Sequence, residues 1–388
     1  MPKESPPLSS IDYRKQLIFA RRLFGTLKTR HSEPLVGPND LNPGRNERIV
    51  NVLRSFSPVL PREVELAGIF YQLPLNLRRK LKSPELRRII DDSDNLSRAG
   101  HEGSVKLLEM LKKGKIHPSA ALVHMASAIA TLENPNVSED ERLRIGKIAV
   151  DVYAPFASSL GLHSVKETLG NLGLMHGYPR EYSAICRSIE DGEPVFEQVV
   201  LPPLRESIRR AADQMLIHYK FSHRIKQPYS AFMKLHKILG ENWREAPNVW
   251  NLQDAAAMRI VLHGDDKRCY EFVSRLKNDP DMGVKIDDDY IKNPKPNGYK
   301  SIHALVKQKD ESRWHELQIR TQTMHIQAEE DNPRQLHSIH KLGQVPLATS
   351  KVLNELKLKT EPHLTATWLH GATFREPTGH GKKRRKKR

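Results

Sequence analysis

Cysteine is scarce in this chain of 388 residues, which contains only Cys186 and Cys269. Two cysteines cannot form a disulfide framework, and the sequence has no CxxC pair to bind zinc. Long apolar runs are also missing, since no segment approaches the roughly 18 residues that a membrane-spanning helix needs. The opening residues, MPKESPP, lack the apolar centre of a secretory signal. These absences predict a soluble cytoplasmic protein without a membrane span.

The net charge is strongly positive, at +17, because 63 lysine and arginine residues outnumber 46 aspartate and glutamate residues. Such a charge attracts polyanions, including nucleotides and nucleic acids. Part of it is concentrated in the basic run Lys382–Arg388, so the rest of the chain is only moderately basic. The run predicts either a solvated cationic end or a contact with RNA or the ribosome.

The hydrophobic pattern divides the chain into a helical part and a mixed part. Residues 1–10 predict a disordered lead, and apolar residues recur at helical spacing over 11–190. Over 200–345 the pattern predicts an α+β domain around one mixed sheet, and 346–388 predict a polar, disordered tail. In the mixed part we expect strands at 223–226, 257–262, 301–306 and 314–320, and helices at 204–215, 230–239 and 269–277.

A cluster of cations borders the first predicted strand. Arg224 and Lys226 share one face of that strand, because residues i and i+2 point the same way. A Pro-Tyr pair then ends the strand, Ser230 is expected to cap the next helix, and Lys234 follows one turn later. Since a helix N-terminus favours anions, the cluster predicts a triphosphate-binding site; the alternative is a solvated basic face.

Two carboxylates are candidates for metal binding or catalysis. Asp254 precedes the second predicted strand, and Mg²⁺ prefers carboxylate oxygens together with substrate phosphates. The alternative is a helix-capping or salt-bridged aspartate. On the last strand Glu316, Gln318 and Arg320 share a face, which predicts the floor of a nucleotide site or plain solvent exposure. Tyr299 follows a Pro-Asn-Gly turn and offers a ring on which a base could stack.

Four segments of the mixed part occur in the order found in one known family. They are Arg224-Ile225-Lys226 with Ser230 and Lys234, Asp254 with Arg259, Asp289–His303, and Glu316–His325. This series resembles the synthetase domain of the RelA/SpoT family, the enzymes that make the alarmone (p)ppGpp. The resemblance covers about residues 205–330. It implies a nucleotidyltransferase-like fold and the transfer of pyrophosphate from ATP to the 3′-hydroxyl of GDP or GTP, with release of AMP.

The resemblance also implies a role for each motif residue. Asp254 and Glu316 would be the catalytic acids and the ligands of Mg²⁺. ATP would be bound by Arg224, Lys226, Ser230, Lys234 and Arg259. GDP or GTP would be bound by Lys295, Asn297, Tyr299, His303, Gln318 and Arg320, with the guanine base stacked on the tyrosine ring.

The helical part resembles the hydrolase domain of the same family, through Val152–Leu162 and Tyr178–Tyr182. The metal ligands of that domain are a histidine, a His-Asp pair and a later aspartate. The corresponding positions of this chain hold Gly37, Tyr71, Gln72 and His124. The resemblance therefore implies a degenerate HD-type domain that has lost its metal and does not hydrolyse the alarmone.

Three positions depart from the family pattern in the synthetase part. His223 replaces a glycine, Asp288 replaces the lysine of bifunctional members, and Pro333 interrupts the last motif. The acidic residue resembles synthesis-only members, and no regulatory domains are expected after residue 345. Two alternatives stay open: the same chemistry on adenosine nucleotides or the 3′ end of tRNA, and a catalytically inactive nucleotide- or RNA-binding regulator. The sequence does not indicate an oligomeric state.

Overall fold

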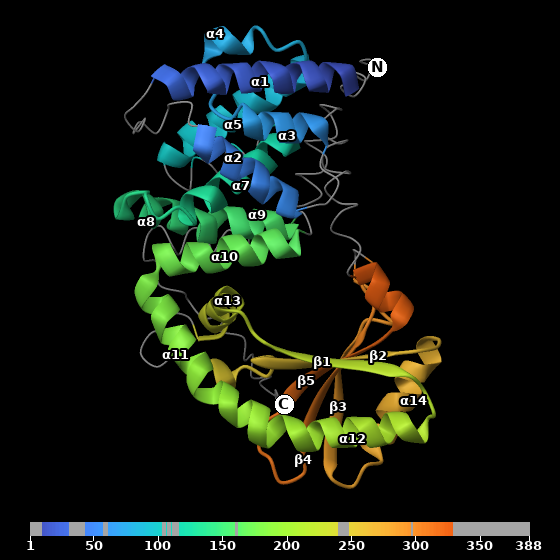
Figure 1. Ribbon diagram of the computed structural model, residues 1–388. Coiled ribbons are helices and arrows are strands. Elements are labelled where there is room, and N and C mark those ends of the chain that lie inside the picture. The colour runs from blue at the N-terminus through green and yellow to red at the C-terminus, as the bar shows by residue number, and fades with distance from the viewer. Residues whose placement is uncertain are drawn as a thin grey trace, which may run out of the picture.

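The computed structural model divides the chain into a helical half and a half built around a β-sheet (Figure 1). It describes residues 10–30, 43–56, 61–102, 106, 110, 116–159, 162–239, 248–295 and 298–328. The expected α+β organisation is confirmed. The predicted tail 346–388 lies outside the described residues, and so does the predicted lead, apart from Ser10, which already belongs to the first helix.

The helical half is organised around one apolar helix. Its described helices are α1 (Ser10–Arg30), α2 (Pro43–Phe56), α3 (Arg62–Ile69), α4 (Leu75–Arg78), α5 (Pro84–Glu102), α7 (Pro118–Leu132), α8 (Glu139–Ile148), α9 (Ala154–Ser159) and α10 (His163–Gly177), with a π-helical turn at Ala149–Tyr153. α7 lies in the core, because almost all of its side chains are small or apolar and are buried. None of the helices in the described ranges combines the length and hydropathy that crossing a bilayer requires.

Close packing at glycines fixes α10 at the side of the helical half that faces the sheet (Figure 1). A Cβ atom on Gly177 would lie 2.5 Å from the backbone nitrogen of Lys147, so α8 and α10 approach at backbone distance. α10 ends at Gly177 and α11 begins at Pro179, where proline is favoured in the first turn of a helix. Gly177-Tyr178-Pro179 therefore separates the two helices.

A nearly continuous helical rod joins the two halves. It consists of α11 (Pro179–Val195), a π-helical turn at Phe196–Val200 and α12 (Leu201–Gln214). In Figure 1 α11 descends from α10, and α12 runs along the sheet. The domain limit expected near residue 190 falls inside α11, so the limits of the two domains stay predictions.

Five strands form the sheet of the second half. They are β1 (Tyr219–Ile225), β2 (Ala256–Leu262), β3 (Met282–Asp289), β4 (Ile302–Gln308) and β5 (His315–Thr321). Their order is β1-β2-β5-β4-β3; β2 and β5 are parallel, and the other neighbours are antiparallel. α13 (Pro228–Leu239) follows β1, and α14 (Asp266–Lys277) follows β2. Four of these strands were expected from the sequence; β3 was not, because its acidic end does not have the alternation of a half-buried strand.

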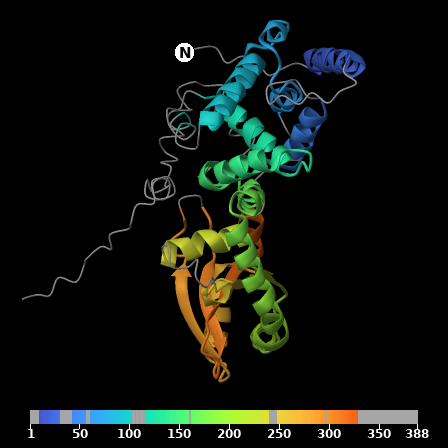
Figure 2. The ribbon, with the colours of Figure 1, turned by 90° about the vertical axis from the view of Figure 1, so that its left-hand side faces the viewer.

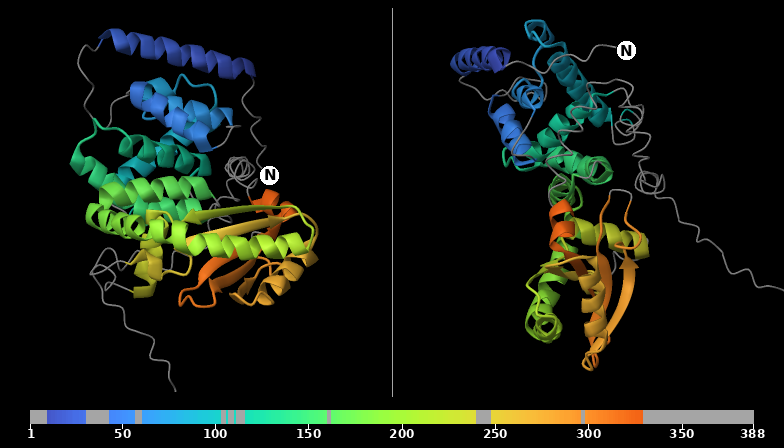
Figure 3. Two further views of the ribbon diagram at one scale, coloured as in Figure 1. Left: turned by 60° about the horizontal axis from the view of Figure 1, so that its bottom comes forward. Right: turned by 90° about the vertical axis from the view of Figure 1, so that its right-hand side faces the viewer.

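The sheet has an apolar face and a polar face. Met258, Ile260, Leu317 and Ile319 alternate along β2 and β5 and are completely buried. They lie on the face covered by α12 and α14, which Figures 2 and 3 show together on one side of the strands. The alternate residues of the same strands lie on the opposite face, and this polar face carries the predicted site.

Candidate active site

Strand pairing brings predicted site residues from neighbouring strands onto the polar face. Arg224 on β1 lies opposite Ala257 on β2, which lies opposite Glu316 on β5. The neighbouring row, two residues away along each strand, contains Ser222, Arg259, Gln318 and His303. Directly paired residues of adjacent strands share a face. The carboxylate, the amide, the histidine and the two arginines therefore lie on the same side of the sheet.

Asp254 lies just before β2 and forms ion pairs with two lysines. Lys226 Nζ lies 2.7 Å from its Oδ2 atom, and Lys234 Nζ lies 2.9 Å from its Oδ1 atom. Burial would raise the pKa of Asp254, but the charges and hydrogen bonds of the two lysines outweigh it and hold the pKa below its ordinary value of 3.8. The carboxylate is therefore ionised at neutral pH and lies among the cations that the sequence analysis assigned to ATP.

Glu316 is the second acid of the site. Gln318 Nε2 donates to its Oε1 atom at 2.7 Å, and His303 Nδ1 lies 3.7 Å from its Oε2 atom. The backbone nitrogen of Glu316 donates to the carbonyl oxygen of Gln253, which places it beside Asp254. Burial and the charge of Asp254 would raise the pKa of Glu316, but the contacts with His303 and Gln318 lower it below 4.5. Both acids are thus charged, close together and only partly exposed.

Ser230 has a different role from the one expected. α13 begins at Pro228, so Ser230 lies inside its first turn and is not the N-cap. Its hydroxyl donates to Glu167 Oε1 at 2.9 Å, across the boundary between α13 and α10. The prediction of a capping serine was wrong, because a carboxylate from the helical half, distant in sequence, accepts the hydroxyl.

Tyr299 belongs to a cluster of rings and cations beside the β3–β4 loop. Its hydroxyl lies 3.0 Å from His303 Nε2, and the ring of Tyr290 packs edge-on, 6.0 Å from the Tyr299 ring. Lys295 Nζ lies 5.1 Å from the centre of the Tyr299 ring, and the Arg320 guanidinium lies 6.0 Å from it. An aromatic ring beside two cations is suited to stack a base and to bind an attached phosphate.

The loop that carries Tyr299 turns at a glycine. Gly298 has a φ of +81°, a conformation that favours glycine, and its backbone nitrogen donates to the Lys295 carbonyl oxygen at 2.8 Å. Asn297, which was also assigned to the acceptor nucleotide, lies outside the described residues. Gln318 and Arg320 are 8% and 2% exposed, so plain solvent exposure of this strand face is wrong.

Two of the departures from the family pattern have defined positions. Asp288 Oδ2 accepts the hydroxyl of Tyr290 at 2.7 Å, and this contact raises the pKa of Tyr290 to about 12. His223 Nε2 lies 2.5 Å from Glu197 Oε1, on the face of β1 opposite to that of Arg224. Tyr290 was not predicted as a site residue, although its position directly after an acidic run and before the turn was the available signal. Pro333 lies outside the described residues.

In the helical half, His124 contacts the tyrosine that stands at the expected metal position. Tyr71 hydroxyl lies 3.1 Å from His124 Nδ1, and Tyr153 hydroxyl lies 2.6 Å from His124 Nε2. Burial lowers the pKa of His124 to about 3, so the ring is neutral. Gln72 Oε1 accepts a hydrogen bond from Arg45. Within the described residues no group of three histidine, cysteine or acidic side chains is placed to hold a metal, and Gly37 lies outside them.

The polar face thus has the features of a site for two phosphorylated ligands: a cation cluster, two ionised acids, and a ring beside further cations. Comparison with known families identifies residues 223–337 as the region found in RelA/SpoT proteins. The resemblance carried by the four motifs is therefore confirmed, because this segment matches the region that RelA/SpoT proteins share.

Individual relatives match about half of the chain. The chain is 31% identical over 193 residues to "Probable GTP diphosphokinase RSH3, chloroplastic" of Arabidopsis thaliana, covering 49% of this chain and 25% of that protein. It is 31% identical over 213 residues to the GTP pyrophosphokinase of Escherichia coli (strain K12), covering 54% and 27%. The crystal structure of small alarmone synthetase 2 from Bacillus subtilis matches with 24% identity and a TM-score of 0.28, covering 43% of this chain and 93% of that one. The chain spans about a quarter of the length of these curated relatives.

Proposed function

We propose that this chain transfers pyrophosphate from ATP to the 3′-hydroxyl of GDP or GTP, forming (p)ppGpp and AMP. The observation that carries the proposal is the meeting of two ionised acids, Asp254 and Glu316, beside Lys226 and Lys234 on the polar face of the RelA/SpoT region. The 3′-oxygen would attack the β-phosphorus of ATP as the bond to the α-phosphate oxygen breaks. Such a reaction depends on positioning and on neutralising the phosphate charge.

The donor nucleotide is assigned to the cations of β1, β2 and α13. Lys226 and Lys234 contact Asp254, and an arriving triphosphate would compete with that carboxylate for both ammonium groups. Arg224 and Arg259 lie in adjacent rows of the same face, where they can contact the phosphates or the base. Ser230 lies one helical turn before Lys234 and would assist through its hydroxyl.

The proposed reaction uses a divalent cation, and Asp254 and Glu316 are the residues that would hold Mg²⁺. The donor set fits, because both carboxylates are ionised, and Mg²⁺ prefers oxygen ligands combined with substrate phosphates. When bound, the ion neutralises the charge of the reacting phosphates. Lys226 and Lys234 occupy both Asp254 oxygens, so they would shift toward the phosphates on binding.

Glu316 is the proposed acceptor of the 3′-hydroxyl proton. Gln318 donates to one of its oxygens and His303 lies 3.7 Å from the other, and these contacts would set the direction in which the carboxylate faces the acceptor ribose. Its lowered pKa keeps it ionised, although a weak base helps mainly once the hydroxyl becomes acidic in the transition state. Tyr299 would stack on guanine, with Lys295, Asn297 and Arg320 completing the acceptor site.

For the helical half we propose an HD-type hydrolase fold without hydrolysis of the alarmone. Both ring nitrogens of His124 already contact tyrosine hydroxyls, and a phenol and an amide at Tyr71 and Gln72 do not replace an imidazole and a carboxylate as metal ligands. The chain would therefore act in synthesis only, in the cytoplasm. A contact of Lys382–Arg388 with RNA stays a prediction, because that run lies outside the described residues.

A nucleotide-product assay tests the proposal. The full chain is incubated with ATP, Mg²⁺ and either GDP or GTP, and the products are separated by anion-exchange chromatography. We expect AMP together with a guanosine tetra- or pentaphosphate. In a parallel reaction, ATP labelled in its β- and γ-phosphates is offered GDP, ADP and tRNA in competition. Transfer of label mainly to ADP or tRNA would show that the acceptor is not a guanine nucleotide. No transfer to any of the three would support the alternative of a catalytically inactive regulator.

The same preparation tests the absence of hydrolysis. Purified ppGpp is incubated with the chain and Mn²⁺ or Mg²⁺, and release of pyrophosphate is measured. We expect no release above the rate without protein. Metal-dependent release would show that the helical half is an active hydrolase.

A further inference from the structure

Helix α10 of the helical half supports the N-terminal end of α13, the helix that carries Ser230 and Lys234. Tyr229 is 2% exposed and lies directly over Gly170, where a Cβ atom would come within 2.2 Å of its ring. The backbone nitrogen of Tyr229 donates to Asn171 Oδ1 at 2.9 Å. The helical half therefore reaches the edge of the cation cluster assigned to ATP.

Three side chains meet where these helices touch. Ser230 hydroxyl donates to Glu167 Oε1 at 2.9 Å, and Lys166 Nζ lies 3.0 Å from the same oxygen. Lys166 Nζ also lies 3.5 Å from Ser230 Oγ. Lys166 is thus a further cation beside Ser230, which lies one helical turn before Lys234, and it comes from the other half of the chain.

The carboxylate of Glu167 is incompletely satisfied in this arrangement. Its Oε2 atom is buried and contacts no hydrogen-bond donor in the described part of the chain. A buried acceptor without a partner costs free energy, so this contact is easier to displace than a fully paired one. A phosphate group presents several acceptor oxygens to the same two donors, the Lys166 ammonium and the Ser230 hydroxyl, and it lies favourably at a helix N-terminus.

We propose that Lys166 is an additional phosphate-binding residue of the ATP site, and that Glu167 competes with the ATP phosphates for Lys166 and Ser230. This inference rests on the proposed function. The helical half would then complete the synthetase site in addition to packing against it. Glu167 would act as a built-in competitor that sets how tightly ATP binds.

The competing explanation is that Lys166 and Glu167 only brace the two halves. The two explanations predict opposite effects of a Glu167 substitution on ATP binding. If the residues form a brace, their removal disturbs α13, and both substitutions weaken ATP binding. If Glu167 is a competitor, removing its charge strengthens ATP binding, whereas removing the charge of Lys166 weakens it.

The test uses Lys166→Met and Glu167→Gln in the full chain. Methionine keeps an unbranched side chain and removes the charge, which lies 5.9 Å from the centre of the Tyr229 ring, and glutamine keeps the shape of the glutamate. Binding of a non-hydrolysable ATP analogue is measured by calorimetry, and KM for ATP and kcat are measured in the product assay. Lys277→Met is the matched control, because Lys277 is an exposed lysine on α14.

We expect Lys166→Met to raise Kd and KM for ATP by about tenfold, the size of one charge-assisted hydrogen bond, with a smaller change in kcat. Glu167→Gln should lower both constants, Lys166→Arg should restore near-normal values, and Lys277→Met should leave them unchanged. A rise in Kd for both Lys166→Met and Glu167→Gln, or no change in either, overturns the inference.

The inference and the proposed function can fail separately. If the chain binds the analogue but transfers no pyrophosphate, the proposed function fails, and the two Kd values still decide the inference. If the wild-type chain transfers pyrophosphate and the variants match it, only the inference fails. A wild-type chain that binds no ATP analogue overturns both.

Discussion

The core of the helical half and the polar face of the sheet both shield ionisable side chains from water, but with opposite results. His124 is buried between two tyrosine hydroxyls, and burial lowers its pKa to about 3, so it is uncharged at neutral pH. Asp254 and Glu316 are only partly buried, and their partners lower the pKa of each acid, so both are charged. The His124 ring has a hydrogen-bonding partner at each nitrogen. Asp254, by contrast, is paired with two lysines that could bind a ligand phosphate in its place. A candidate site therefore differs from a structural core in having partly buried charged groups whose partners a ligand can replace.

The largest effect should come from removing either charge on the sheet. Asp254→Asn or Glu316→Gln should lower kcat for pyrophosphate transfer by about 10²–10⁴-fold, since each removes a proposed metal ligand or proton acceptor. The product assay measures the rate, and a thermal melt shows whether the fold is retained. Tyr153→Phe is the contrasting variant, because it disturbs the His124 network while leaving the sheet intact; its kcat should stay near that of the wild type. Normal turnover in the Asp254→Asn or Glu316→Gln variant would show that the substituted acid is not needed for pyrophosphate transfer.

A second effect should appear in how stability depends on pH. Because the pKa of His124 falls from 6.5 to about 3 on folding, the unfolded chain binds a proton in this window and the folded chain does not. The free energy of unfolding should therefore fall on acidification below pH 6.5, by up to about 1.4 kcal/mol per pH unit from this residue.

Urea unfolding of the wild type and of His124→Gln at pH 7, 6 and 5 measures this slope. The window lies above the ordinary pKa values of Asp254 and Glu316, 3.8 and 4.5, whose stabilising charges are lost only at lower pH. Burial raises the pKa of Asp151 to about 6, which acts in the opposite direction but equally in both proteins. The wild type should lose more stability than the variant between pH 6.5 and 5. Parallel slopes would mean that His124 is protonated in the folded chain.

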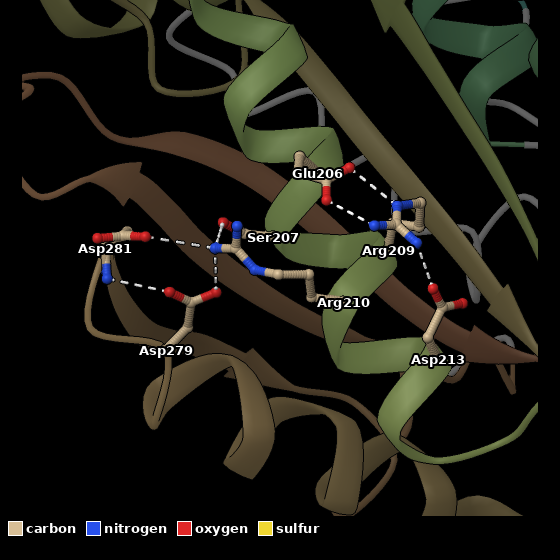
Figure 4. Close-up of polar contacts among 7 residues, drawn as sticks. All are labelled: Glu206, Ser207, Arg209, Arg210, Asp213, Asp279 and Asp281. Carbon is tan, nitrogen blue, oxygen red and sulfur yellow. Dashed lines mark hydrogen bonds and ion pairs between the residues drawn. The ribbon is translucent and has the colours of Figure 1, made fainter.

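The smallest effect should come from ion pairs at the surface, which Figure 4 shows around α12. Arg210 donates to Asp279 at 2.8 Å and to Ser207 at 3.0 Å, so it joins α12 to the turn before β3. Arg209 pairs only with Glu206 and Asp213 on its own helix in the contacts drawn there.

The side chains of Arg209 and Arg210 are 51% and 40% exposed, so solvent screens both ion pairs and each contributes little. Arg210→Ala should lower the melting temperature slightly, and Arg209→Ala should lower it less, because only Arg210 connects separate elements. Differential scanning calorimetry of the two variants makes the comparison. A larger loss for Arg209→Ala would show that local helix stability outweighs the link to the sheet.

Local patterns predicted most elements of the fold, because helical spacing and strand alternation depend only on residues that are close in sequence. β3 was missed, since an edge strand with an acidic end pairs only with β4 and needs no alternating apolar face. The residues of the polar face were predicted through motif resemblance. The contact of Ser230 with Glu167 was not, because it joins residues 63 positions apart and depends on how α10 packs against α13. The pairing of Lys226 with Asp254 was not predicted either, because it joins residues 28 positions apart and depends on how β1 and β2 pair.

The place of β5 in the sheet has a consequence for how the protein is made. β5 is the last strand in sequence, yet it lies in the middle, joining the β1–β2 pair to the β4–β3 pair. Until residues 315–321 have left the ribosome, the β1–β2 and β4–β3 pairs have no strand to join them, and β2 and β4 each have one edge without a partner strand. Glu316 arrives with that closing strand, so the proposed catalytic acid joins Asp254 in the same step that completes the sheet. The two acids therefore come together only when the sheet of this domain is complete.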